Sequence, residues 1–482
     1  MPESPAPLTA DGDGGAPPRA SVLARLRERD HTRGNLLSSV LVLSLPQVAM
    51  SALGFGLFQL VDLRFLSLLG DDAVAAAGAA NQTLRQVFML LILGLNVSTQ
   101  MWIARLVGQG RVDAAEHVAG QSFLLGGGIA LIGLVTCGLF PEFFVSLVAR
   151  DPAVVELGAV YVRIVFVTLG LMVANQTFNG VLHGAGDATT PMIITFIVAP
   201  VSIVAEWALA FGRLGAPELG IAGIALGAAL GGSCGIAVAA WALFSGRCRV
   251  HLRARHLVPD LQGLRDLLAT AWQPALHMVA RTLIVIFFMT LAGRLGGKVQ
   301  AAYTIGLRVE MLAIMIAFPI SNACATLVGQ NLGAGNLRRA WRTLFVSAGV
   351  SAAALWPASL GLWWFRADLV GFFTSDPEVA ALAVEYLGYS AAILLFYGFY
   401  FIGFRTLQAA GDMRSPMLIS VGCAVLLGAP MGFYLSRFTD AGASGMWLAN
   451  FVYAMVNCAI TVAWLARGRW ARLPQSAAES PA

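Results

Sequence analysis

The segment LLSSVLVLSLPQVAMSALGFGLFQLVDLRFLSLLG, residues 36–70, decides the fold class of this chain. Residues 36–61 contain no charged side chain, and about 20 apolar residues in a helix are enough to cross the hydrocarbon core of a bilayer. Asp62 and Arg64 then follow within the same apolar run. A carboxylate at membrane depth costs about 3 kcal/mol on insertion scales. Such a residue therefore either has a partner that offsets this cost or has a function that requires it. We interpret Asp62 as the ion-coupling residue of a transporter.

The composition of the whole chain agrees with a protein embedded in a lipid bilayer. Of its 482 residues, 58% are hydrophobic and only 12% are charged, whereas soluble domains average about 25% charged residues. Backbone polar groups in lipid must be satisfied internally, so the long apolar runs predict helices rather than open strands. The 52 glycines favour close helix packing in an all-α bundle.

About twelve transmembrane spans can be drawn along the sequence. We place them at 36–64, 74–105, 115–140, 154–182, 190–212, 219–245, 267–293, 300–328, 340–365, 379–408, 415–436 and 442–466. The predicted organisation is a disordered tail (1–35), an N-lobe (36–245), a basic linker (246–266), a C-lobe (267–466) and a C-terminal tail (467–482).

Arginine is distributed unevenly among the loops between the predicted spans. It is concentrated in the N-terminal tail, in the loops after the second, sixth and eighth spans, and after the last span. The positive-inside rule therefore predicts that both termini are cytoplasmic, as an even number of spans also requires. We attribute the net charge of +5 to this bias and not to nucleic-acid binding.

Short sequence motifs recur in the two halves of the chain at a nearly constant spacing. This order predicts two six-span halves that are inserted the same way up, related by a pseudo-two-fold axis along the membrane normal, with a cleft between them. The matched pairs are LVGQ at 106–109 and 327–330, GAGDATTPM at 184–192 and AAGDMRSPM at 409–417, Asp151-Pro152 and Asp376-Pro377, and Pro46 and Pro274.

Taken in order, these motifs resemble the multidrug and toxic compound extrusion (MATE) family. The resemblance rests on VD at 61–62, the two LVGQ loops, the two Gly-Asp loops, and FGRLGAPELGIAG at 211–223. It implies a two-lobed exporter of small organic, cationic amphiphilic compounds, driven by H⁺ or Na⁺ and needing no other cofactor. It also implies a monomer in the bacterial cytoplasmic (inner) membrane, on the DinF-like branch of the MOP exporter superfamily.

The resemblance also implies an ion site in the N-lobe. Its positions correspond to Asp62, Ser202 and Glu206, where the two carboxylates would share a proton or bind Na⁺ as hard oxygen ligands. The C-lobe acids of some members are absent at their expected positions, which hold Arg281 or Thr282 and Tyr397. Coupling is therefore expected in the N-lobe. The alternative is that Asp62 pairs with Arg64 at the membrane interface and that the Glu206 side chain extends to the outside.

Other polar and aromatic residues lie within the predicted spans. Arg281 could form a buried ion pair with Glu310, or could take part in substrate binding or gating. Aromatic rings can bind cations through their faces, although helix packing or lipid contact is the plainer explanation for each ring. The candidate lining residues of the substrate cavity are Gln47, Phe287, Phe288, Arg281, Tyr397 and Tyr400.

Two other functions are considered beside the exporter. A flippase for a lipid-linked precursor belongs to the same superfamily and typically has extra spans or a strongly basic cavity. A membrane-embedded enzyme would need a convergent polar constellation, and the sequence offers only Asp62 with Glu206. Since neither a P-loop GxxxxGK[ST] nor an HExxH motif occurs, we expect no enzymatic activity and no ATP-driven transport by this chain alone.

Overall fold

The computed structural model describes residues 30–69, 86–146, 155–156, 159, 162–163, 169–246 and 248–472. These ranges contain helices and turns and no β-strand. Eleven of the described helices are long and apolar enough to cross a membrane by length and composition. The predicted all-α, multispanning fold class is confirmed.

The N-lobe contains the helices that precede the central linker. Its first predicted span is divided into three pieces, and its fourth span is described without gaps only from residue 169 onward. The elements are α2 (Leu36–Ser51), η1 (Ala52–Phe58), α3 (Gln59–Leu69), α5 (Gln86–Gly108), α6 (Val112–Gly133), η3 (Leu134–Gly138), α7 (Pro141–Ser146), α9 (Leu169–Ala185), α10 (Thr189–Ala210) and α11 (Ile221–Phe244).

The C-lobe contains the helices from α12 onward. Several are longer than predicted, because helical structure continues through the polar residues that flank the apolar core. The elements are α12 (Leu261–Leu295), α13 (Gly297–Gly333), α14 (Leu337–Phe373), α15 (Pro377–Ala409), α16 (Arg414–Cys423), η5 (Ala424–Gly428), α17 (Ala429–Arg437) and α18 (Gly442–Ala466), with the short turns η4 (Ala254–Leu257) and η6 (Arg469–Arg472) at its two edges.

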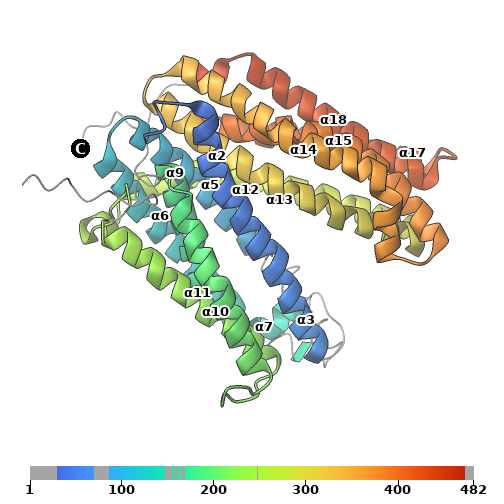
Figure 1. The fold of residues 1–482 in the computed structure, drawn as a ribbon, viewed down its shortest axis with the longest axis horizontal. Helices are drawn as coiled ribbons and strands as arrows, with labels where there is room; N and C mark the ends of the chain where they lie inside the picture. Colours follow the sequence, from blue (N-terminus) through green and yellow to red (C-terminus); the bar gives the residue numbers. More distant parts are fainter. Residues whose placement is uncertain are drawn as a thin grey trace, which may run out of the picture.

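The two lobes meet at one end and diverge toward the other, so that the molecule has the outline of a V (Figure 1). We call these the joined end, where α2 and α14 begin, and the splayed end, where α3 lies. The first helix of each lobe also packs against the other lobe: α2 contacts α13 and α14, and α12 contacts α5 and α6. The lobes are thus linked through these helices as well as through the linker.

Glycine allows the two lobes to approach closely at the joined end. A Cβ atom built at Gly108 of α5 would lie 2.1 Å from the carbonyl oxygen of Gln330 in α13. One built at Gly333 would lie 2.1 Å from the carbonyl oxygen of Arg105, and one at Gly329 would lie 2.8 Å from the Cβ of Ala104. The two LVGQ motifs therefore lie against each other across the lobe interface, and their glycines let the backbones touch.

The first span is not a continuous α-helix. Pro46 lies inside α2, and the π-helical segment η1 separates α2 from α3. Proline removes a backbone hydrogen bond, and π-helical segments interrupt the regular ladder, so both are common causes of a bend. Between the joined end and Asp62, the regular helical hydrogen bonding of this span is therefore interrupted at two points, Pro46 and η1.

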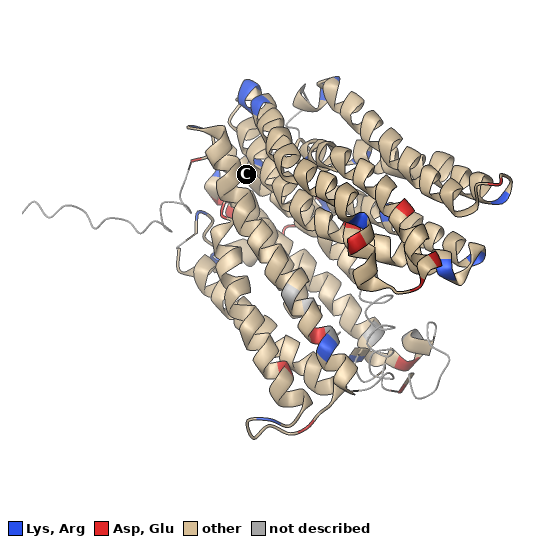
Figure 2. Ribbon diagram, turned by 45° about the vertical axis from the view of Figure 1, so that its right-hand side comes forward, with Lys and Arg blue, Asp and Glu red and all other residues tan. Residues whose placement is uncertain are grey.

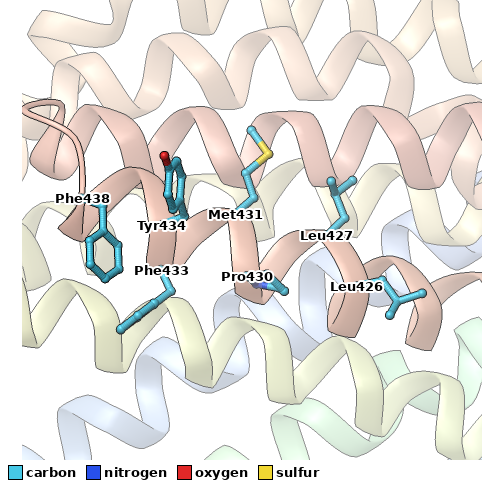
Figure 3. A pocket seen from close by; sticks show the side chains of 7 residues that line it. All are labelled: Leu426, Leu427, Pro430, Met431, Phe433, Tyr434 and Phe438. Carbon is cyan, nitrogen blue, oxygen red and sulfur yellow. The ribbon is translucent and has the colours of Figure 1, made fainter.

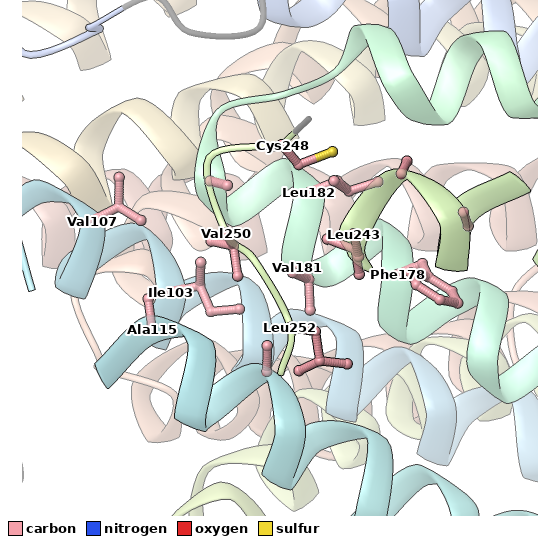
Figure 4. Packing of buried hydrophobic residues seen from close by; sticks show 14 of the residues in the cluster. Ile103, Val107, Ala115, Phe178, Val181, Leu182, Leu243, Cys248, Val250 and Leu252 are labelled. Carbon is pink, nitrogen blue, oxygen red and sulfur yellow. The ribbon is translucent and has the colours of Figure 1, made fainter. Parts of the chain in front are cut away.

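The central linker is packed against the N-lobe and is not a free loop. Cys248, Val250 and Leu252 are buried in alternation and join the core formed by α5, α6, α9 and α11 (Figure 4). The predicted linker boundary is corrected at its end, because α12 already begins at Leu261, where the Asp260 side chain accepts a hydrogen bond from the Gln262 backbone. That bond holds the pKa of the Asp260 carboxyl below its usual range.

Candidate functional site

Charged residues lie mainly near the ends of the helices, and most of the length of each helix has none (Figure 2). The exceptions among the described residues are few, and each lies within a predicted span. Besides Arg64, Arg308 and Glu385, they include Asp62, Glu206, Arg281, Glu310 and Arg405. Ionisable residues at membrane depth are costly and usually functional, so these five define the candidate sites.

The structure brings the predicted N-lobe carboxylates together. Asp62 lies on α3, which packs against α10 and α11 toward the splayed end. It interacts electrostatically with Glu206 of α10. Asp62 is partly exposed, whereas Glu206 is completely buried (0% exposed). Residues about 140 positions apart in the sequence therefore form a single site.

The Glu206 carboxylate has no hydrogen-bond partner among the described residues. Both of its oxygens are buried, and no donor in the described ranges reaches either of them. An ionised carboxylate in an apolar environment costs several kcal/mol unless it is paired or hydrogen-bonded. A proton or a bound cation would remove that cost. The Asp62 carboxylate beside it adds like-charge repulsion, which favours the same outcome.

Glycines of α11 form the wall behind this pair. A Cβ atom at Gly227 would lie 2.4 Å from the backbone nitrogen of Glu206, and one at Gly231 would lie 1.8 Å from the Ser202 hydroxyl oxygen. Ser202 and Glu206 are one turn apart on α10, and both are buried against this glycine stripe. Ser202, Glu206 and Asp62 therefore occupy one small region of the N-lobe, as the resemblance implied.

The C-lobe contains a buried carboxylate that the predicted acid positions did not include. Glu310 of α13 accepts hydrogen bonds from the hydroxyls of Tyr386 (3.2 Å) and Tyr397 (3.0 Å), both on α15. The predicted ion pair between Arg281 and Glu310 is not formed, because no Arg281–Glu310 contact lies within 4.0 Å in the described structure. The Arg281 guanidinium lies 5.0 Å from the centre of the Phe401 ring instead.

Two of the residues predicted to line a substrate cavity are enclosed in the C-lobe core. Phe288 is 1% exposed and packs in the cluster of Tyr303, Tyr386 and Trp447, where Gly432 leaves space for its ring. Tyr400 is also buried, and its hydroxyl is within hydrogen-bond distance of the His277 ring (3.2 Å). Phe287, Tyr397 and Arg281 remain partly exposed.

The joined end contains a second polar cluster, centred on Arg405 of α15. This arginine is 2% exposed and donates hydrogen bonds to the side-chain oxygens of Gln100, Asn322 and Gln408. Gln100 belongs to the N-lobe, so the cluster crosses the lobe interface. The sequence motifs did not single out Arg405. Its position inside an apolar run, FIGFRTLQ at 401–408, was the available signal.

The predicted cavity residue Gln47 belongs to this joined-end cluster. The Asn322 amide donates to the Gln47 side-chain oxygen (2.9 Å), and thereby links α13 to the first span. The Thr326 hydroxyl donates to the carbonyl oxygen of His183 (2.9 Å), and the Gln330 amide donates to that of Gly184 (3.1 Å). Hydrogen bonds between the lobes therefore connect α2, α5 and α9 to α13 and α15 at the joined end.

Two other features of the described residues do not behave as substrate or metal sites. Asp113, Glu116 and His256 have ligand atoms close together, but the Arg255 side chain donates to both Asp113 and His256 and supplies the cation there.

A groove of about 630 Å³ lies on η5 and α17, lined by Leu426, Leu427, Pro430, Met431, Phe433, Tyr434 and Phe438 (Figure 3). These residues are almost entirely apolar, and several are highly exposed, as expected for a surface that faces lipid.

The family comparison agrees with the internal repeat and with the fold. The MatE family model matches residues 48–208 and 274–434, once in each lobe. The chain belongs to the MATE family. The motifs that first suggested this assignment lie inside or directly beside the matched ranges.

Curated relatives of this MATE protein extend over nearly its whole length. It is 25% identical over 440 residues to a "Probable multidrug resistance protein NorM" of Thermotoga maritima, covering 89% of this chain and 92% of the relative. It is 27% identical over 443 residues to the "Multidrug resistance protein NorM" of Burkholderia vietnamiensis, with the same coverage. The finer assignment to a DinF-like branch stays a prediction.

A solved structure confirms the fold. The chain matches a structure described as the "Outward-facing conformation of a multidrug resistance MATE family transporter of the MOP superfamily" with a TM-score of 0.84. The match covers 92% of this chain and 97% of that one at 21% identity. The two-lobed architecture predicted from the sequence repeats is therefore confirmed.

Proposed function

We propose that this MATE protein is a secondary active multidrug exporter that exchanges H⁺ or Na⁺ for its substrates. Both NorM relatives are named as multidrug resistance proteins, and this supports the general activity. The observation that carries the coupling proposal is Glu206, a completely buried carboxylate without a hydrogen-bond partner among the described residues, beside Asp62.

The proposed coupling step is the binding of one cation by this pair. A proton, or a Na⁺ bound by the two carboxylates and the Ser202 hydroxyl, would lower the charge of the pair from −2 to −1 and remove the repulsion between the carboxylates. The α3 segment could then pack more closely against α10 and α11. Because an ion shifts a two-state equilibrium only through its different affinities for the two states, the pair must be rearranged in the other state.

The first span offers a physical route from this site to the joined end. Asp62 lies on α3, and Gln47, which accepts the hydrogen bond from Asn322, lies on α2. Between them the backbone contains the π-helical segment η1, and Pro46 directly precedes Gln47. We propose that repacking of α3 is taken up as a bend in this region, and that the bend strains the Gln47–Asn322 bond between the lobes.

We further propose that the joined end faces the cytoplasm, with both termini on that side of the bacterial inner membrane. Arginines gather at this end, as the positive-inside rule requires. They include Arg105, Arg111, Arg338, Arg339 and Arg467. In this orientation the lobes diverge toward the outside, so the structure represents a state that is closed to the cytoplasm.

An efflux assay in inverted membrane vesicles tests the proposal. Vesicles are loaded through the transporter with ethidium, first with a pH jump and then, separately, with a Na⁺ jump. The proposal expects substrate movement driven by one of the two gradients and absent from vesicles without the protein. Failure of both gradients to drive any substrate in the panel would contradict an ion-coupled exporter.

A flippase for a lipid-linked precursor is the second candidate, because Arg281 lies within a span, is partly exposed and could bind a phosphate group. Reconstitution with a fluorescent lipid-linked phosphate separates the two functions. Ion-dependent movement of the lipid between leaflets, without movement of ethidium, would favour the flippase. Ethidium movement alone would favour the exporter.

A further inference from the structure

Arg281 places an unusual charge inside the C-lobe. It projects from α12 into a space bordered by α13, α15 and α18, where it interacts electrostatically with Tyr397, Tyr400, Tyr453 and Glu310. Its guanidinium lies over the Phe401 ring at 5.0 Å. Unlike the completely enclosed Phe401, the arginine side chain is partly exposed. Part of the arginine surface is therefore accessible from outside the C-lobe core.

The guanidinium lacks the acceptors that its chemistry demands. It carries five N–H donors, and no described residue accepts a hydrogen bond from any of them. The nearby carboxylate does not fill this role, since the two oxygens of Glu310 already accept from Tyr386 and Tyr397 and no oxygen of Glu310 lies within 4.0 Å of Arg281. A cation at membrane depth without acceptors is costly.

Arg405 differs from Arg281 in its partners, because both of its terminal guanidinium nitrogens have acceptors and only its Nε has none among the described residues. Arg405 is enclosed and donates to three side-chain oxygens, those of Gln100, Asn322 and Gln408. Both arginines lie over a phenylalanine ring, but around Arg281 the nearby polar groups are phenol hydroxyls rather than amide oxygens, and Arg281 retains exposure. An aromatic face stabilises the cation but leaves the planar fork of N–H groups available.

We propose that Arg281 binds the carboxylate of amphiphilic aromatic substrates, and that this C-lobe site selects substrates with an anionic group. The proposal rests on the export function above and names its substrate class. A carboxylate matches the guanidinium fork in a bidentate arrangement, and the rings of Phe401 and the neighbouring tyrosines offer apolar surface to the rest of the molecule. The proposed substrate class, zwitterions and anions, differs from the cationic amphiphilic compounds expected from the sequence, and that expectation stays a prediction.

The test is direct binding to the purified, full-length protein in a neutral detergent without an ion gradient. The probes are a rhodamine free acid and its methyl ester, which differ only in the carboxylate. We expect the wild-type protein to bind the acid more tightly than the ester. Arg281→Gln should weaken acid binding by about ten- to one-hundredfold, as expected for lost charge-assisted hydrogen bonds, and change ester binding less than about twofold. Arg281→Lys should bind the acid with an affinity between those of the wild type and of Arg281→Gln.

The matched control is Arg467→Gln. Arg467 stacks on Trp464 at 5.1 Å, nearly the same separation as in the Arg281–Phe401 pair, but it is exposed at the end of α18. This variant should bind both dyes like the wild type. Competition by phosphatidylglycerol, but not by benzoate, would assign the site to a lipid phosphate and overturn the proposal for a substrate carboxylate.

Equal binding of acid and ester by the wild type would overturn the proposal without any variant. Unchanged acid binding by Arg281→Gln, or loss of both dyes by a monodisperse Arg281→Gln protein, would do the same. The export function is tested separately. If the wild type binds the acid more tightly than the ester in detergent but transports neither dye in energised vesicles, the result supports the binding site and contradicts the export function.

Discussion

A single methyl group added at Gly108 should shift this protein away from the state in which its lobes are joined. In Gly108→Ala the new Cβ would lie 2.1 Å from the Gln330 carbonyl oxygen and 2.8 Å from both the carbonyl carbon and the Cα of that residue. Real Cβ atoms essentially never approach another atom within 3.0 Å, and here the neighbour is backbone in a packed helix. The α5 and α13 backbones must therefore separate.

The size of the effect follows from the cost of overpacking. Forcing an extra methyl group into a packed interface costs about 1–3 kcal/mol, and if only the joined state has this contact, the whole cost falls on that state. The ratio of joined to separated molecules should then fall by about 5- to 150-fold. Helix propensity favours alanine over glycine by about 1 kcal/mol but acts equally on both states.

Spin labels on the two lobes would report this shift. We would attach them to cysteines introduced at Val112 and Leu337, which are 40% and 39% exposed and begin α6 and α14. In a background without native cysteines, Gly108→Ala should populate a second, longer distance. Gly127→Ala is the control, because a Cβ there meets open space. An unchanged distance distribution in Gly108→Ala would refute the role assigned to the glycine contact.

Three further outcomes are expected. Gly231→Ala places a methyl group 1.8 Å from the Ser202 hydroxyl oxygen and must displace this proposed ion ligand, so vesicle efflux should need a several-fold higher concentration of coupling ion. The control Gly232→Ala, whose methyl group meets open space, should behave as wild type. Asn322→Leu removes three side-chain hydrogen bonds at the joined end, with Gln47, His183 and Arg405, and its apparent melting temperature should fall by a few degrees, as expected for a loss of about 1–3 kcal/mol; an unchanged value would contradict the role of that cluster. Tyr397→Phe leaves one of two phenol donors on the C-lobe carboxylate, so transport should fall only mildly; complete loss of coupling would move the ion site to the C-lobe.

The fold could be predicted from local features of the sequence. The lengths of the apolar runs indicate the spans, and the recurrence of LVGQ in the two halves of the chain indicates the repeat. The meeting of Gly108 with the backbone of Gln330 could not be predicted in this way. Periodicity shows that a glycine lies in a helix, but the partner of that glycine depends on how two helices cross, which is a property of the assembled lobes.

The candidate site was predictable where an acid interrupts an apolar run. Asp62 stands out because its cost in lipid is large, and Glu206 was placed beside it only through the family resemblance. The surroundings of Glu310 and Arg281 were not predictable, because the tyrosine hydroxyls that satisfy Glu310 lie on another helix. The Arg405 cluster was missed for the same reason: its acceptors are neutral amides on three helices, which leave no charge pattern in the sequence.

The central claim is that the Asp62–Glu206 pair couples ion entry to export. The most direct measurement is ion-driven efflux by Asp62→Asn, with its amount in the membrane quantified in the same cells. Asparagine removes the titratable charge while nearly keeping the shape and hydrogen-bonding capacity of aspartate, so the variant should insert and fold normally. We predict efflux at background with a wild-type amount of protein, and the same result for Glu206→Gln. Normal efflux by Asp62→Asn at a normal membrane level would contradict the account.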